Sequence, residues 1–334
     1  MHTKTQKLSL CLLSGSLVFT TPLWAEEKVV TADEVVSALE KTYGVHIGER
    51  RNHTKGTCAA GEFIGLPEAA AYTRSVLFSG KTIPVIARFS IPSGNPNIPD
   101  TTKNPRGMAL EFKLPDNNLH HITMLNTPVF GAATPQTFLD DIVAKTPDPA
   151  TGKPDPEKIK AFKASHPDSL PQAEFLEKNN PPISWANSSY FGIHTFKFIN
   201  KDEKTTPVRW RFVPQDGEKS LTDSELKSSP ANFLEQKLID RAKESPIRWD
   251  MMLTLGEPGD PDNNPTLLWP KERKEIKVGT LTISSALPQK GAECEKINFD
   301  PLIMADGIKP SDDPVLLFRS PGYAVSFGKR LSGK

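Results

Sequence analysis

The chain has 334 residues, with 41 lysines and arginines against 40 aspartates and glutamates, for a formal net charge of +1. A nearly neutral protein offers no electrostatic basis for binding nucleic acid or an anionic membrane, so we expect neither as a partner. The length allows a large single core or two domains.

The first residues are typical of a secretory leader. Lys4 and Lys7 precede an apolar run at residues 8–19, and the segment ends on the small residue Ala25. A positive start, an apolar middle and a small residue at the cut define a signal peptide, and the run is too short to cross a bilayer. We therefore expect a signal peptide at residues 1–25, a single domain at residues 26–334, and a periplasmic or secreted protein.

Removal of the leader, which contains Cys11, leaves two cysteines, Cys58 and Cys294. In an oxidising compartment such a pair suggests one disulfide. Two free buried thiols are an alternative, and a peroxide-reactive thiol at Cys58 is another.

A helix is predicted to begin at Thr31, because Thr31 and Glu34 form a capping-box pattern ahead of an apolar face, and Gly44 is a plausible stop. Short runs of alternating apolar and polar residues then predict strands at residues 83–90, 108–113, 119–125, 194–199, 208–213, 249–255 and 278–284. Their number and turn-rich spacing favour an α+β protein built on an antiparallel β-barrel of about eight strands.

Further helices are expected around the barrel. Thr134-Pro135 suits the start of a helix that continues to Lys145. Short helices are expected at residues 156–165 and 170–178, and another follows Ser229-Pro230 and ends near Lys243. Residues 256–265 resemble a calcium loop but lack its closing glutamate, so we expect an ordinary loop.

Two clusters carry side chains suited to chemistry. Tyr323 has Arg319 four residues before it and Arg330 seven residues after it. A phenolate can bind haem iron, one arginine can favour its charged form, and another can pair with a haem propionate. His53, in a polar turn, could act as an acid–base group. A surface tyrosine and a surface histidine are the plainer alternatives.

Several motifs follow one another in a fixed order. They are Arg-x-x-His-x-Lys-Gly at 50–56, Arg-Phe-Ser at 88–90, Asn-Pro-Arg-Gly at 104–107, Asn126 with Pro-Val-Phe at 128–130, Gly-Ile-His-Thr-Phe-Lys at 192–197, Trp-Pro at 269–270, Val-Gly-Thr-Leu at 278–281, Phe-Asp-Pro at 299–301 and the segment around Tyr323. From about residue 44 to its end, the chain resembles the catalase superfamily in these motifs. The resemblance implies haem b, with its iron, as the cofactor.

On the distal side, the resemblance implies three catalytic roles. His53 would move the peroxide proton from one oxygen to the other. Ser90 would bond the far nitrogen of that histidine and fix its tautomer. Asn126 would orient the peroxide.

On the proximal side, the resemblance implies that Tyr323 is the iron ligand and that Arg319 keeps it ionised. His194 and Asp313 fall where the family has a histidine and an aspartate behind that arginine. The residues that match the propionate-binding positions are Arg50, Arg88 and Arg330.

Three features depart from an ordinary catalase. The chain ends eleven residues after Tyr323, without the connecting segment and helical domain, which favours a monomer or dimer. Gly131 stands where catalases have an aromatic residue, and Asn52 stands where a small apolar residue precedes the distal histidine. Both changes would make the distal pocket roomier and more polar. The pattern resembles the catalase-related peroxidases, small secreted forms of the fold.

The expected function is therefore a haem peroxidase that reduces hydrogen peroxide or organic hydroperoxides with a small organic electron donor and has little or no catalase activity. One alternative is a haem hydroperoxide lyase or dehydratase on the same fold. A second alternative is a periplasmic barrel that binds haem or another small ligand without turnover.

Overall fold

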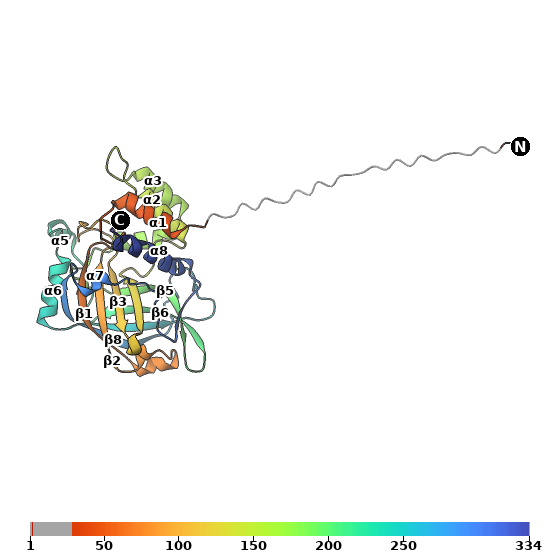
Figure 1. The fold of residues 1–334 in the computed structure, drawn as a ribbon, viewed down its shortest axis with the longest axis vertical. Helices are drawn as coiled ribbons and strands as arrows, with labels where there is room; N and C mark the ends of the chain where they lie inside the picture. Colours follow the sequence, from red (N-terminus) through yellow and green to blue (C-terminus); the bar gives the residue numbers. More distant parts are fainter. Residues whose placement is uncertain (1, 3–28, 334) are drawn as a thin grey trace.

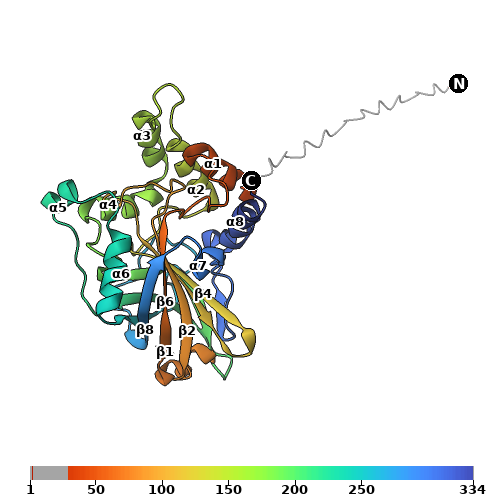
Figure 2. The same cartoon turned by 60° about the vertical axis from the view of Figure 1, so that its left-hand side comes forward.

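The structure is a computed structural model that describes residue 2 and residues 29–333. The predicted signal peptide lies outside the described residues, apart from residue 2. Figures 1 and 2 show a β-barrel with helices gathered over one end and along one side. The expected α+β class is confirmed.

Eight antiparallel strands close into the barrel in the order β4-β3-β2-β1-β8-β7-β6-β5, and β4 pairs with β5 through Leu125 and Phe191. The strands are β1 (Gly56–Gly65), β2 (Thr82–Ser90), β3 (Gly107–Lys113), β4 (Leu119–Leu125), β5 (Tyr190–Ile199), β6 (Thr205–Pro214), β7 (Ile247–Leu255) and β8 (Glu275–Pro288). A short ninth strand, β9 (Ile308–Pro310), pairs with the other end of β5. The predicted barrel of about eight strands is thus confirmed.

Aromatic side chains fill the barrel. Phe63 packs edge-on against Phe112 with ring centroids 5.4 Å apart, and Phe212 and Trp249 are fully buried in the same core. A barrel of eight strands has an interior just wide enough for side chains. Because this interior is filled, a large cofactor has to bind outside the barrel wall.

Three helices form a layer over one end of the barrel: α1 (Ala32–Tyr43), α2 (Pro135–Ala144) and α8 (Pro314–Leu331). The predicted capping box of α1 is present, with Thr31 accepting from the Glu34 backbone and Glu34 from the Thr31 backbone. Val35 and Leu39 on α1 pack with Ile142 of α2, and Phe318 of α8 lies against them. Burial of each large apolar side chain contributes about 1.5–3 kcal/mol to the packing of this layer.

The remaining helices lie outside the barrel, and the first of them packs on α2. They are α3 (Pro156–Ser165), α4 (Leu170–Lys178), α5 (Asp223–Ser228), α6 (Leu234–Glu244) and α7 (Glu293–Lys296), with single 3₁₀ turns at Pro67–Ala71, Val76–Phe78, Pro115–Asn117, Pro167–Ser169 and Trp185–Asn187. The predicted bounds of α3 and α4 are confirmed. Residues 256–265 form a loop, as expected. Among the described residues, no helix is long and apolar enough to cross a membrane.

The segment around Tyr323 is a helix and not a basic tail. Asp313 caps the start of α8 by accepting from the backbone N–H groups of Val315 and Leu316, and Pro314 occupies the first turn, where a missing N–H costs nothing. Pro321 lies inside the helix, which explains why its sequence does not look helical.

A disulfide joins Cys58 at the start of β1 to Cys294 in α7, with Cα atoms 5.6 Å apart. The structure therefore has the predicted bridge, and neither free buried thiols nor a reactive Cys58. The bridge is buried against Phe299, and it ties the strand that follows His53 to the segment before Phe299.

Candidate active site

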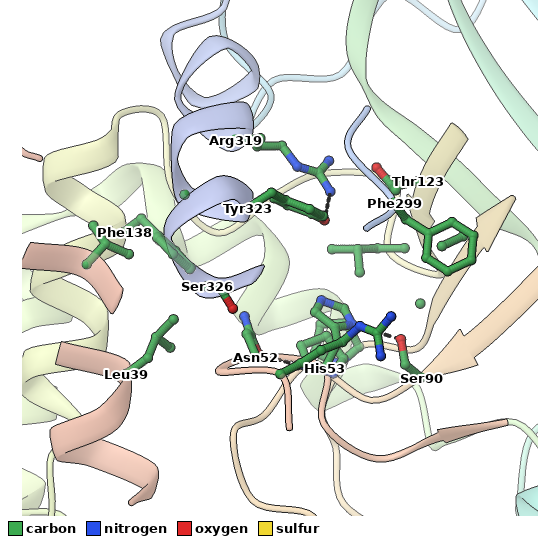
Figure 3. A pocket seen from close by; sticks show the side chains of 18 of the residues that line it. Leu39, Asn52, His53, Ser90, Thr123, Phe138, Phe299, Arg319, Tyr323 and Ser326 are labelled. Carbon is green, nitrogen blue, oxygen red and sulfur yellow. Dashed lines mark hydrogen bonds between the residues drawn. The ribbon is translucent and has the colours of Figure 1, made fainter. Parts of the chain in front are cut away.

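A cavity of about 320 Å³ lies between the outer barrel wall and the layer of α1, α2 and α8. Tyr323 and His53 both line it, and Figure 3 shows their side chains entering it from opposite sides. The cavity therefore brings together the two residues that the sequence singled out, which lie 270 positions apart.

On one side, α8 presents Arg319 and Tyr323 from the same helical face, because residues four apart are neighbours there. Arg319 Nη2 donates to the phenolic oxygen of Tyr323 at 2.7 Å, and the guanidinium carbon lies 5.4 Å from the ring centroid. Charge-assisted bonds of this kind are strong. This one fixes the phenolic oxygen inside the cavity.

Behind this pair, His194 of β5 donates from Nδ1 to Asp313 at 2.6 Å, with both side chains buried. Burial lowers the pKa of His194 below its ordinary value, and this outweighs the opposite effect of Asp313. Asp313 also caps α8. The two residues thus anchor the start of the helix that carries Tyr323 to the barrel wall.

On the opposite side, His53 sits in an unusual backbone conformation with a φ of +56°. Three bonds hold it there. Its Nδ1 bonds Ser90 Oγ at 2.9 Å, its N–H donates to Asn52 Oδ1 at 2.9 Å, and its carbonyl accepts from Arg88 at 2.7 Å. Left-handed backbone at a residue other than glycine costs energy and is found at functional sites, where the surroundings enforce it.

The charge state of His53 follows from its surroundings. Burial and the nearby cations Arg88, Arg319 and Arg50 lower the pKa of His53 to about 3. The imidazole is therefore neutral at physiological pH. If Nδ1 donates its hydrogen to Ser90 Oγ, then Nε2 is free to accept a proton in the cavity.

Three arginines of the cavity wall have backbone and amide partners but no carboxylate partner among the described residues. Arg50 donates to the carbonyls of Cys294, Glu295 and Ile297, and Arg88 to Gln289. Burial and mutual repulsion lower the pKa of Arg50 to about 8 and that of Arg88 to about 10.

Arg330 completes this cationic group, and its Nη1 is buried without a hydrogen-bond partner in the described part of the chain. An orphaned buried donor beside the buried Arg88 and the partly buried Arg50 fits carboxylates supplied by a ligand. Together with a tyrosine oxygen opposite a histidine and largely apolar walls, this set fits a haem: Tyr323 as ligand to the iron, and the arginines on the propionates.

Asn126 is the one predicted catalytic residue that does not line the cavity in this structure. Its Oδ1 accepts from the Arg106 backbone N–H at 2.6 Å, which leaves its amide nitrogen as the group that could reach a ligand. Its role in orienting a peroxide stays a prediction.

Gln172 on α4 lines the cavity and was missed from the sequence. A Cβ atom added to Gly131 would lie only 2.6 Å from Gln172 Oε1. The space that Gly131 leaves free is thus taken in part by the polar amide group of Gln172. No sequence signal links two positions 41 residues apart on a loop and a helix.

The chain is similar to known proteins over most of its length. A family model described as "Catalase" matches residues 29–334. The "Catalase-related peroxidase" of Synechococcus elongatus is 60% identical over 91% of this chain and 90% of its own length, and that of Mycolicibacterium paratuberculosis is 32% identical over 89% and 94%. A solved bacterial catalase superposes with a TM-score of 0.78 at 26% identity, over 95% of this chain and 64% of that one.

The chain belongs to the catalase family, and the predicted resemblance is confirmed. It is an oxidoreductase of that family, whose members bind haem. It spans less than two thirds of the solved bacterial catalase, so the likeness is to the barrel core of that protein.

Proposed function

We propose that this protein is a haem b peroxidase that reduces hydrogen peroxide or organic hydroperoxides with a small organic electron donor and has little or no catalase activity. The observation that carries the proposal is the neutral imidazole of His53, held by Ser90 and facing the Arg319–Tyr323 pair across one cavity. Binding alone would not require a base in this position.

The chemistry of the protein's own residues is proton transfer and positioning. His53 Nε2 takes the proton from one peroxide oxygen and returns it to the oxygen that leaves, while Ser90 keeps the imidazole in the tautomer that allows this. When bound, haem supplies the redox-active iron that the peroxide oxidises. Arg50, Arg88 and Arg330 would hold its propionates.

The preference for peroxidase over catalase chemistry rests on the distal pocket and on two relatives. Asn52 and Gln172 place polar groups in the otherwise largely apolar cavity wall, and Gly131 stands where the resemblance to catalases implies an aromatic side chain. Two relatives that match this chain over most of both lengths are named as catalase-related peroxidases.

We also propose that the protein is exported and acts as a monomer or dimer. The disulfide between Cys58 and Cys294 supports an oxidising compartment.

The test is steady-state consumption of hydrogen peroxide by the haem-loaded protein, with and without guaiacol, followed together with oxygen evolution. The proposal expects peroxide consumption that depends on the donor and evolves little oxygen. Rapid oxygen evolution without a donor would indicate a catalase. Conversion of a fatty-acid hydroperoxide without a donor would indicate a lyase or dehydratase.

A further inference from the structure

The side chain of Gln172 is fixed in one orientation by its partners. Its Nε2 lies 2.9 Å from Thr127 Oγ1 and 3.0 Å from the Val129 carbonyl oxygen. A carbonyl only accepts, and the Thr127 hydroxyl gives its own hydrogen to the same carbonyl at 2.9 Å. Both partners therefore require the NH₂ group, and both amide hydrogens of Gln172 are used.

This leaves Gln172 Oε1 as an acceptor at the cavity wall without a hydrogen-bond donor in the described residues. It lies over Gly131, where any larger residue would push it aside. A further bond, from the Ala133 backbone N–H to Asp168 at 2.9 Å, holds the loop against the Pro167–Ser169 turn that directly precedes α4. These bonds thus fix the position of Gln172 Oε1 at the cavity wall.

Next to this acceptor the cavity wall is aromatic. Phe130 precedes Gly131 directly and packs on Phe138 of α2, with ring centroids 5.8 Å apart and planes tilted by 36°. Both phenylalanines line the same cavity as His53 and Tyr323. Figure 3 shows Phe138 with Leu39 on the α1 and α2 side of the cavity, opposite Thr123 and Phe299.

We propose that Gln172, Phe130 and Phe138 form the binding site for the reducing substrate, and that this substrate is an aromatic molecule with a hydroxyl or amino group. The ring packs on the two phenylalanines, and the O–H or N–H donates to Gln172 Oε1. The assignment rests on the proposed peroxidase function and names the class of its donor.

The chemistry balances for such a donor. Each phenol gives up one electron and the proton of its hydroxyl group, and becomes a phenoxyl radical. Two phenols thereby reduce one hydroperoxide to an alcohol and water, or one hydrogen peroxide to two waters.

The test compares wild type with Gln172→Met, which keeps the length of the side chain and removes the acceptor. Ferrocyanide, which has neither a ring nor a hydrogen to donate, serves as the reference donor for guaiacol. Loss of one neutral hydrogen bond should lower the guaiacol-to-ferrocyanide ratio of kcat/KM by roughly 2- to 12-fold. Gly131→Ala, which displaces Oε1, should lower the same ratio, and Gln236→Met, on the exposed face of α6, should leave it unchanged.

A second measurement is independent of turnover. Calorimetry without peroxide should show that wild type binds guaiacol more tightly than 1,2-dimethoxybenzene, its ether without a hydroxyl group. Gln172→Met should lose this preference.

The outcomes separate the two proposals. If wild type oxidises both donors but Gln172→Met leaves the ratio and the binding preference unchanged, the donor site is wrong and the peroxidase function stands. Equal losses with both donors, or loss of haem absorbance in Gln172→Met, would also overturn the donor site. If wild type oxidises neither donor, the peroxidase function fails, and calorimetry alone decides whether the aromatic site exists.

Discussion

At the residue scale, His53 shows how the chain keeps a base available in a strongly cationic cavity. Burial lowers the pKa of its imidazole and three nearby arginines lower it further, so the imidazole stays neutral far below its ordinary pKa. Ser90 and Asn52 hold its ring nitrogen and its backbone N–H. The arginines thus help set its charge state, Ser90 and Asn52 help set its orientation, and Arg88 contributes to both through its bond to the His53 carbonyl.

Substitution of His53 by glutamine should lower peroxide turnover by about 10²- to 10⁴-fold, the usual contribution of general acid–base catalysis. Haem absorbance should persist, because the predicted iron ligand is Tyr323. His166→Gln, at the end of α3 and away from the cavity, is the matched control and should keep wild-type turnover. Undiminished activity in His53→Gln would contradict the role of His53 as the general base.

The pH dependence of kcat/KM for peroxide should reflect the lowered pKa of His53. The neutral imidazole is the working form, and it persists above a pKa of about 3. We therefore expect a profile that is flat from pH 7 to about pH 4 and falls only near pH 3, measured by rapid pH jumps that precede acid unfolding. An inflection near the ordinary histidine value of about 6.5 would contradict this.

Several site residues could be predicted from sequence because their family motifs are local: His53, Ser90 and Tyr323 each sit in a short ordered match. Gln172 could not, since its meaning depends on the empty space over Gly131. The hydrogen bond from the Arg106 backbone N–H to Asn126 Oδ1 could not be predicted either, because it forms only in the folded chain.

At the scale of elements, Glu40 of α1 joins both sides of the cavity. It accepts from Arg51, which lies two residues before His53, and from Lys329, which neighbours Arg330, at 2.7 Å each. Burial alone would raise the pKa of Glu40, but Lys329 and Arg51 outweigh it and hold the pKa below its usual value. The Glu40 carboxylate thus joins the turn that carries His53 to α8.

Glu40→Gln should lower the free energy of unfolding by about 1–3 kcal/mol at pH 7, since it removes charged hydrogen bonds. The folded state lowers the pKa of this carboxyl, so its contribution is present above the unfolded value of about 4.5 and is lost as the pH falls below it. Denaturant unfolding at pH 7 and pH 3.5 measures both effects. The control is Glu174→Gln, in an exposed pair with Lys178, which should cost little at either pH. Equal stability of wild type and Glu40→Gln at pH 7 would contradict a stabilising role for the Glu40 carboxylate.

Elements were predictable where the local signal was strong. The capping box of α1 and the prolines in the first turns of α2, α3 and α4 gave clear starts. Strand β1 was missed because its glycines and alanines have low strand propensity. Its Gly61 is needed for close approach, since a Cβ there would lie 1.9 Å from the Thr282 carbonyl oxygen.

At the scale of the whole molecule, the disulfide between Cys58 and Cys294 closes a loop over 236 positions. Replacing both cysteines by serine should lower the free energy of unfolding by up to about 5 kcal/mol in the chain-entropy model. Denaturant midpoints of the two proteins test this, and mass measurement after alkylation, with and without reductant, shows whether the purified chain carries the bridge. Identical midpoints would mean that the bridge does not stabilise the fold.

The most direct test of the whole account is titration of the purified wild type and Tyr323→Phe with haem, followed by Soret absorbance and peroxide turnover. Tyr72→Phe, which alters a half-buried tyrosine away from the cavity, is the matched control. The account predicts one haem per chain and peroxide turnover in wild type and the control, and loss of tight haem binding and of turnover in Tyr323→Phe. Full haem binding and turnover in Tyr323→Phe, or a wild type that binds no haem, would contradict it.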